Sequence, residues 1–456
     1  MGLSLLVCLG RHTVTGFLAA CGRLFRDWSA DYRLFSQDVW EIHRLFAPIL
    51  EGIHHDLAPS LPFVAALDDT HLRKTGTHIP GVSYPRDPLS PAFHVNLVRS
   101  LRFIQVSGMY TQGGPPGPAR SIPLRFEAAP AVPKPKHNAP PEALKAYKER
   151  RRKENLNTAA LATLAGLRRE LDGLPGGADR HLIISHDASY TNQVILRGCP
   201  ERTTLIGRIR KDAKLFYPPS QAEPGRRGAK RKYGPQTPTP EALRQDDRIP
   251  WQEVRAYAAG RLHTFRVKTL GPVLWPKAGA EARLRLVVIA SVGYRLRKGS
   301  KLLYHQPAHL ISTDPDLSLE ETVQYYLWRW DIEVNHRDEK RIIRVGEAQV
   351  RSPRSVKWLP AFAVASYAML LLAGVRAFGL DATQPACPPP LWRRGQVKKR
   401  LSTEDLLQYF RSEVWAQALE SLGLNSGHFA TAGTLDPKCP EFNLPLASTV
   451  LYYRNG

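Results

Sequence analysis

One segment late in the chain places charged and aromatic side chains at helical spacing. Ser318 and Glu321 form a capping-box pattern, which predicts that a helix begins there. At about 100° per residue, four side chains of this helix fall within roughly 60° of one another on one face. They are Tyr326, Arg329, Glu333 and Lys340. Such a face presents a carboxylate flanked by cations, although ion pairs on a solvent-exposed helix produce the same pattern.

An apolar stripe adjoins this charged face and is expected to pack the helix against a sheet. Its members are Val323, Leu327, Trp330 and Val334.

Two acidic motifs lie upstream, each at the end of a short apolar run typical of a buried strand. Asp68 and Asp69 end the run that starts at Phe63, and Asp187 follows the run that starts at His181. An aspartate after a strand is most often a turn or cap residue. Three converging carboxylates would instead suit a hard divalent cation such as Mg²⁺ or Mn²⁺.

The three motifs together resemble the DDE transposases of bacterial insertion sequences. The pattern Y-x2-R-x3-E-x6-K, a signature of one large group of these enzymes, is complete from Tyr326 to Lys340. Leu67-Asp68-Asp69-Thr70 is similar to the family's D-x-T after its first strand. Ser185-His186-Asp187-Ala188-Ser189-Tyr190 is similar to its strand-terminal aspartate, followed by a small residue and an aromatic.

The resemblance implies that Asp68, Asp187 and Glu333 are catalytic and bind metal, either Mg²⁺ or Mn²⁺, as a pair of ions. Asp69 is an alternative to Asp68, because adjacent residues of a strand point to opposite faces and a register error of one residue would exchange them. Two ions about 4 Å apart can bind both the attacking and the leaving oxygen of a phosphodiester displacement.

The resemblance also implies phosphate-binding roles. Tyr326, Arg329 and Lys340 are expected to contact DNA near the scissile bond. Arg208 and Arg210 lie in a basic strand similar to one in the family, and we expect them to bind DNA phosphates as well. The implied activity is cleavage of DNA at the ends of an insertion sequence and joining of the 3′ ends to target DNA.

The fold class expected from these features is α/β. The resemblance implies a ribonuclease-H-like mixed sheet flanked by helices, with a β-rich insertion and helical N- and C-terminal parts. The predicted division is a helical, DNA-binding domain at 1–58, a first part of the catalytic core at 59–199, the insertion at 200–308, the rest of the core with the acidic helix at 309–379, and a basic helical region at 380–456.

Composition favours a polyanionic partner over a membrane. Lys and Arg outnumber Asp and Glu by 64 to 41, which gives a formal charge of +23. The five cysteines show no paired metal-ligand spacing, which is typical of a reducing compartment. The apolar run 359–375 contains Pro360 and falls short of about 20 residues, so we interpret it as a buried core helix. A bacterial cytoplasmic location follows as an expectation.

The expected partners are double-stranded DNA, both terminal inverted repeats and target, and a second copy of the chain bound to that DNA. Basic runs at 145–153 and 226–232 could neutralise further phosphates, or could simply be solvated surface. The first run is at the start of a predicted helix that continues towards Gly173. Two alternatives remain open: a related nuclease or degraded copy that binds DNA without transposing it, and an unrelated basic RNA-binding protein.

Overall fold

The computed structural model describes residues 1–38, 40–87, 90–91, 93–219, 231–295, 299–383 and 400–421. Most of the basic run 226–232 and most of the region 380–456 lie outside the described residues.

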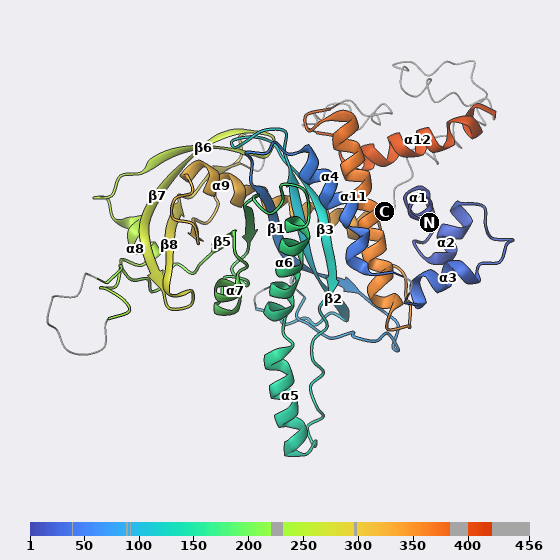
Figure 1. Ribbon diagram of the computed structural model, residues 1–456, viewed down its shortest axis with the longest axis horizontal. Helices are drawn as coiled ribbons and strands as arrows, with labels where there is room; N and C mark the ends of the chain where they lie inside the picture. The colour runs from blue at the N-terminus through green and yellow to red at the C-terminus, as the bar shows by residue number, and fades with distance from the viewer. Residues whose placement is uncertain are drawn as a thin grey trace.

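A nine-stranded sheet crosses the molecule in the order β3-β2-β1-β4-β5-β11-β8-β7-β6 (Figure 1). β1, β4 and β5 are parallel neighbours, whereas β2 and β11 pair antiparallel at either side of them. The strands are β1 (Phe63–Arg73), β2 (Ser100–Tyr110), β3 (Arg120–Ala128), β4 (Leu182–His186), β5 (Thr203–Arg208), β6 (Gln252–Ala258), β7 (Arg261–Trp275), β8 (Gly279–Ile289) and β11 (Ala308–Ser312), with β9 (Gly293–Tyr294) and β10 (Leu303–Tyr304) forming a separate pair.

Helices flank this mixed sheet, so the α/β fold expected from the sequence is confirmed and is consistent with a ribonuclease-H-like architecture. The helices are α1 (Gly2–Val7), α2 (Val14–Ala20), α3 (Ser29–Ser36), η1 (Ile42–Leu45), α4 (Ala47–Asp56), α5 (Pro141–Lys153), α6 (Leu156–Asp172), α7 (Gln193–Gly198), α8 (Pro240–Gln245), α9 (Leu319–Trp328), α10 (Trp330–Arg341), α11 (Ser355–Phe378) and α12 (Thr403–Ser421).

The parallel strands have two differently covered faces because successive side chains of a strand alternate. Ala65 and Leu67 belong to the main core, which also holds the inward side chains of α6. Val64 and Ala66 point the other way and pack with Tyr325 and Trp328 of α9. The sheet is therefore buried on both sides where the acidic motifs lie.

The apolar run interpreted as a core helix forms α11, which lies along β3 and against the N-terminal helices (Figure 1). It is the one described helix that is long and apolar enough to cross a membrane, but 83% of its most apolar window is buried inside the protein. Burial against the sheet and the helices explains its apolar composition without a membrane.

Two sequence expectations need correction. The charged helix expected to run unbroken from residue 145 towards Gly173 is two helices, because Asn155 and Thr158 form a capping box that starts α6. Trp330 is 64% exposed and does not pack on the sheet; α9 and α10 bury Tyr325, Trp328 and Ile332 instead.

The region predicted as a β-rich insertion is not a separate sheet. β5 pairs directly with β4, and β11, β8, β7 and β6 extend the same sheet beyond it. The domain boundaries proposed from the sequence stay predictions.

Candidate active site

The parallel strands align the first two acidic motifs. Leu67 of β1 is paired with His186 of β4, so the next residues, Asp68 and Asp187, are level at the carboxyl ends of the two strands. Neighbouring strands lie about 4.8 Å apart, and side chains in one row point to the same face. The fold therefore brings Asp68 and Asp187 together.

Arg208 continues this row on the third strand. His186 is paired with Gly207 of β5, and Arg208 follows it. A side chain at Gly207 could not be accommodated, because a Cβ there would lie 2.2 Å from Cε1 of His186. The absence of a side chain at Gly207 leaves room for the ring of buried His186, on the face of the sheet opposite to Asp68 and Asp187. Its Nδ1 is 2.9 Å from the carbonyl oxygen of Asp187.

Asp69 points to the opposite face and has its own partners. Its Oδ1 accepts a hydrogen bond of 2.7 Å from the hydroxyl of Tyr190, and its Oδ2 accepts one of 2.7 Å from Nε of Arg102. Tyr190 is fully buried, and burial together with Asp69 raises the pKa of its phenol, so the phenol keeps its proton and donates it. Since both Asp69 oxygens are engaged, the geometry favours Asp68 of the two alternatives.

The acidic helix begins as the sequence predicts. Ser318 and Glu321 form the capping box of α9, and α10 follows after Arg329. Ser185 of β4 donates a hydrogen bond of 2.9 Å to the carbonyl of Tyr325, which ties α9 to the strand that carries Asp187. The helix therefore crosses the sheet on the face to which Asp68 and Asp187 point.

Arg329 lies between two of the carboxylates. Its Nη1 is 3.8 Å from Oδ2 of Asp68 and 3.5 Å from Oε1 of Glu333. Arg329 is 9% exposed, and its Nε and Nη1 are buried without a hydrogen-bond partner in the structure. A buried guanidinium with free donors suits an anionic ligand such as a phosphate, because leaving those donors unpaired costs about 1 to 3 kcal/mol each.

Tyr326 lies beside this guanidinium. The Arg329 guanidinium carbon is 5.7 Å from the centre of the tyrosine ring, within the range of a cation–π contact. The charges of Arg329, Arg208 and Asp187 all act on the phenol, whose pKa is raised chiefly by burial. Tyr326 thus lies beside the row formed by Asp68, Asp187 and Arg208.

The other two predicted phosphate ligands differ in position. Lys340 is close enough to Asp68 for that carboxylate to act on its ammonium. Arg210 extends into the loop after β5, where it forms two hydrogen bonds of 2.9 Å with exposed Asp212. Arg210 is therefore at the margin of the site.

Burial makes Asp68 an unusual carboxyl group. Its side chain is 17% exposed, and removal from water raises its pKa to about 7, while the adjacent backbone amide and Arg329 oppose that shift. The neighbouring charges of Asp187 and Asp69 raise the pKa further. Positive charge brought to this position would stabilise the ionised form.

A comparison with family models supplies the independent evidence. A family model described as DDE superfamily endonuclease matches residues 3–277. The chain belongs to the DDE superfamily endonucleases. The match includes Asp68 and Asp187 and ends before α9, so Glu333 rests on the fold and on the sequence pattern alone. No curated protein matches the chain.

Membership of this endonuclease family indicates a nuclease-type enzyme that acts on DNA, and such endonucleases generally use divalent metal ions. The oxygen donors of Asp68, Asp187 and Glu333 have the chemistry that Mg²⁺ or Mn²⁺ prefers. Among the described residues, no three His, Cys, Asp or Glu side chains are close enough to form a ready metal cluster. Arg329 accounts for the separation of Asp68 from Glu333, because its guanidinium lies between them.

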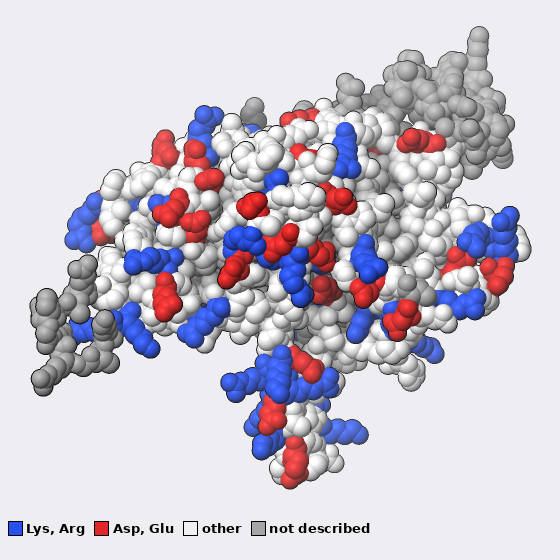
Figure 2. Space-filling model, viewed as in Figure 1, with Lys and Arg blue, Asp and Glu red and all other residues white. Residues whose placement is uncertain are grey.

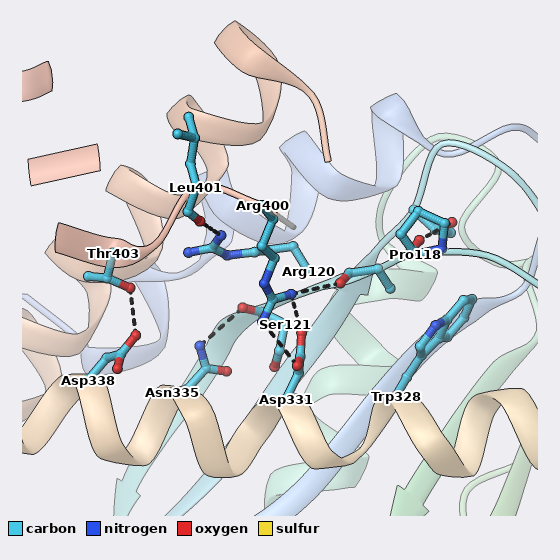
Figure 3. Close-up of polar contacts among 12 residues, drawn as sticks. Pro118, Arg120, Ser121, Trp328, Asp331, Asn335, Asp338, Arg400, Leu401 and Thr403 are labelled. Atoms are coloured by element: carbon cyan, nitrogen blue, oxygen red, sulfur yellow. Dashed lines mark hydrogen bonds and ion pairs between the residues drawn. The ribbon is translucent and has the colours of Figure 1, made fainter. Parts of the chain in front are cut away.

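The face of α10 away from Glu333 is held by the segment that follows residue 399 (Figure 3). Arg400 forms hydrogen bonds of 2.7 and 3.1 Å with Asp331, and Thr403 donates one of 2.7 Å to Asp338. Asn335 donates to the carbonyl of Ser121 in β3. On a helical wheel, Asp331, Asn335 and Asp338 lie roughly 140 to 160° from Glu333.

This C-terminal latch, defined by Arg400 and Thr403, fixes the rotation of α10 about its own axis. The sequence predicts the segment as basic and helical, but no local pattern connects it with α10, a helix some 65 residues earlier. Arg120 of β3 completes the contact by donating a hydrogen bond of 2.6 Å to the carbonyl of Leu401.

A buried polar pair also escaped the sequence analysis. Glu339 is 1% exposed, and burial raises the pKa of its carboxyl to about 8, although Gln105 of β2 hydrogen-bonds to it. Gln105 is level with Asp68 on the neighbouring strand. Glu339 is therefore a buried carboxyl group of α10 that is largely protonated, and so neutral, at pH 7.

Proposed function

We propose that the protein is a DNA transposase, which cuts DNA at the ends of an insertion sequence and joins the freed 3′ ends to target DNA. The observation that carries the proposal is the placement of Asp68 level with Asp187 at the ends of β1 and β4, with Arg329 between Asp68 and Glu333 of α10. The family match supports the nuclease chemistry, and the spacing from Tyr326 to Lys340 favours transposition within it.

Two chemically similar displacements would make up the reaction. In the first, a water oxygen bonds to phosphorus, the bond from phosphorus to the 3′ oxygen breaks, and the strand ends are a 3′-hydroxyl and a 5′-phosphate. In the second, that 3′-hydroxyl bonds to a phosphorus of the target DNA and displaces another 3′ oxygen. Both steps form and break one phosphorus–oxygen bond, so no external energy source is needed.

The protein's residues would position the phosphate and the ions. Arg329 would donate its unpaired Nε–H and Nη1–H to the scissile phosphate, with Arg208 and Lys340 neutralising the adjoining phosphates. Asp68, Asp187 and Glu333 would hold one or two Mg²⁺ or Mn²⁺ ions. Such ions, when bound, lower the pKa of water and stabilise charge on the leaving oxygen.

Further elements of the proposal are the partners and the location. Terminal inverted repeats and target DNA would be bound by a dimer, because two ends must be cut and joined together. The protein would act in the bacterial cytoplasm, on the nucleoid. The basic net charge of +23 favours such binding through phosphates.

The test is strand cleavage of a labelled plasmid that carries the DNA flanking the gene, with Mg²⁺ or with EDTA. Asp187→Ala should abolish Mg²⁺-dependent cuts. Asp179→Ala, which removes an exposed carboxylate just before β4, is the matched control and should cut normally. Binding without any cutting by the unaltered protein would instead favour a DNA-binding relative without transposase activity.

A further inference from the structure

Residues 129–155 form an arm that projects from the body of the molecule (Figure 1). The chain leaves β3 at Ala128, runs through a Pro-rich stretch, and returns as α5 before α6 begins. None of the residues of α5 is buried, and α5 makes no extensive contact with any other described helix or strand. We call residues 129–155 the basic arm, since it contains eight Lys and Arg and three Glu.

The basic arm leaves the sheet near the strand ends that carry the acidic row, which we define as Asp68 and Asp187. Asp68 is paired with Gln105, which is paired in turn with Phe126 of β3. β3 ends two residues later at Ala128. A duplex lying across Asp68 and Asp187 can therefore continue towards the arm.

Three of the six Lys and Arg side chains of α5 share one face of the helix. At about 100° per residue, Lys145, Lys148 and Arg152 fall within roughly 60° of one another. The half-buried Ala143 and Tyr147 lie on the opposite side of the helix. The three cations thus form an exposed stripe that spans about 10 Å along the helix axis.

Core packing does not account for this element. An isolated helix of 13 residues is marginally stable in water, and α5 gains little from burial. Its basic C-terminal turn and the Arg150–Glu154 ion pair of 2.8 Å stabilise it only modestly. Figure 2 shows Lys and Arg side chains exposed along the arm, next to fewer acidic ones. A polyanion along the stripe would add the missing stabilisation.

We propose that the basic arm binds the backbone of duplex DNA beyond the cleavage point, through Lys145, Lys148 and Arg152. This inference rests on the proposed function for the position of the DNA, and adds a contact outside the acidic site. The α5 helix is about 20 Å long, which corresponds to about 6 base pairs of duplex. Because phosphates are the ligands, the contact is independent of base sequence.

The experiment measures the affinity of the full chain for labelled duplexes in EDTA, from 50 to 200 mM salt. The variant is Lys145→Gln, Lys148→Gln and Arg152→Gln together. The control removes three exposed cations on β6, β7 and β8, the last three strands of the sheet on the side away from the arm, by Arg255→Gln, Arg261→Gln and Arg283→Gln. Glutamine keeps helix propensity high, so the arm retains its conformation.

Loss of three phosphate contacts should lower the slope of log affinity against log salt by about 2.7. Over this fourfold range of salt, the affinity of the unaltered protein should therefore fall about 40-fold more than that of the variant. The difference should appear with long duplexes and vanish with duplexes shortened by about 6 base pairs on the arm side. Cleavage of the short duplex in Mg²⁺ should be unchanged.

An unchanged slope in the arm variant, or an equal decrease in the control, would overturn the inference and leave the proposed function intact. Equal binding of duplex RNA, with the same loss of slope, would overturn the choice of DNA as partner. An arm-dependent slope in a protein that cuts no DNA under any condition would support the arm contact and overturn the proposed function.

Discussion

The hydrogen bond from Tyr190 to Asp69 joins the two strands that carry the first two acidic residues. Tyr190 lies three residues after Asp187, and Asp69 is the neighbour of Asp68. The 2.7 Å bond is partly buried, and its acceptor is a carboxylate, so its removal should destabilise the fold by about 1.5 to 3 kcal/mol. Tyr190→Phe removes the bond without changing the shape of the side chain much.

The main consequence should be in metal binding. Partners that orient the surroundings of a metal ligand commonly change metal affinity by 10- to 100-fold. Tyr190 acts through Asp69, which is one residue from Asp68, and itself lies three residues from Asp187, so we expect the low end of that range. Tyr190→Phe should raise the dissociation constant for Mn²⁺, measured by calorimetry, about tenfold. The Mg²⁺ concentration for half-maximal cleavage should rise equally, with the rate at saturating Mg²⁺ little changed.

Tyr110 provides a matched control, because its hydroxyl hydrogen-bonds to the carboxyl of Asp56 far from the acidic row. Tyr110→Phe should destabilise the fold without changing Mn²⁺ affinity. If both variants lose stability and neither changes Mn²⁺ affinity, Tyr190 has a structural role only, and the reasoning is refuted.

Two further predictions concern α10. Because burial raises the pKa of Glu339 from 4.5 to about 8, the folded protein binds more protons there than the unfolded chain, and stability should fall as pH rises between those values, by up to about 5 kcal/mol. Glu339→Gln should flatten this dependence in urea unfolding from pH 5 to 8, and identical slopes for the two proteins would contradict it. Arg400→Gln should cost about 1 to 2 kcal/mol, because its ion pair with Asp331 is partly exposed, and should slow cleavage by freeing α10. A double-mutant cycle with Asp331→Asn checks the pair, and fully additive losses would argue against it.

The sequence carried the local features of the site well. Apolar runs ending in aspartate located β1 and β4, and the Ser318–Glu321 capping box fixed where the acidic helix begins. These signals depend on residues a few positions apart, which a single sequence displays directly. The choice between Asp68 and Asp69 needed the register of β1 against β4, and strand register depends on partners distant in sequence.

Long-range partners were also invisible. Arg102 and Tyr190 meet Asp69 only because β2 and the loop after β4 lie beside β1. Trp330 fits an apolar stripe at helical spacing, yet the neighbouring face of the helix contacts the sheet. Periodicity shows that a helix has an apolar side, but two adjacent faces of α9 and α10 were both apolar enough to pack.

The two elements that carry Asp68 and Glu333 share one design. Strand β1 directs Asp68 towards α10, while the next residue, Asp69, is bound on the other face by Tyr190 and Arg102. Helix α10 carries Glu333 beside Arg329, while Asp331 is bound on the other side of the helix by Arg400. In each case a second carboxylate, on the opposite face, has fixed partners.

This arrangement limits how the site can relax. The carboxylates facing the site cannot approach cations freely, because the strand and the helix that carry them are held from behind. Their mutual repulsion is opposed inside the site by Arg329. A phosphate that pairs with Arg329 would weaken that opposition and so increase the demand for divalent cations at Asp68 and Glu333. Binding of DNA and binding of metal should therefore favour each other, as linkage requires of two ligands that stabilise one arrangement.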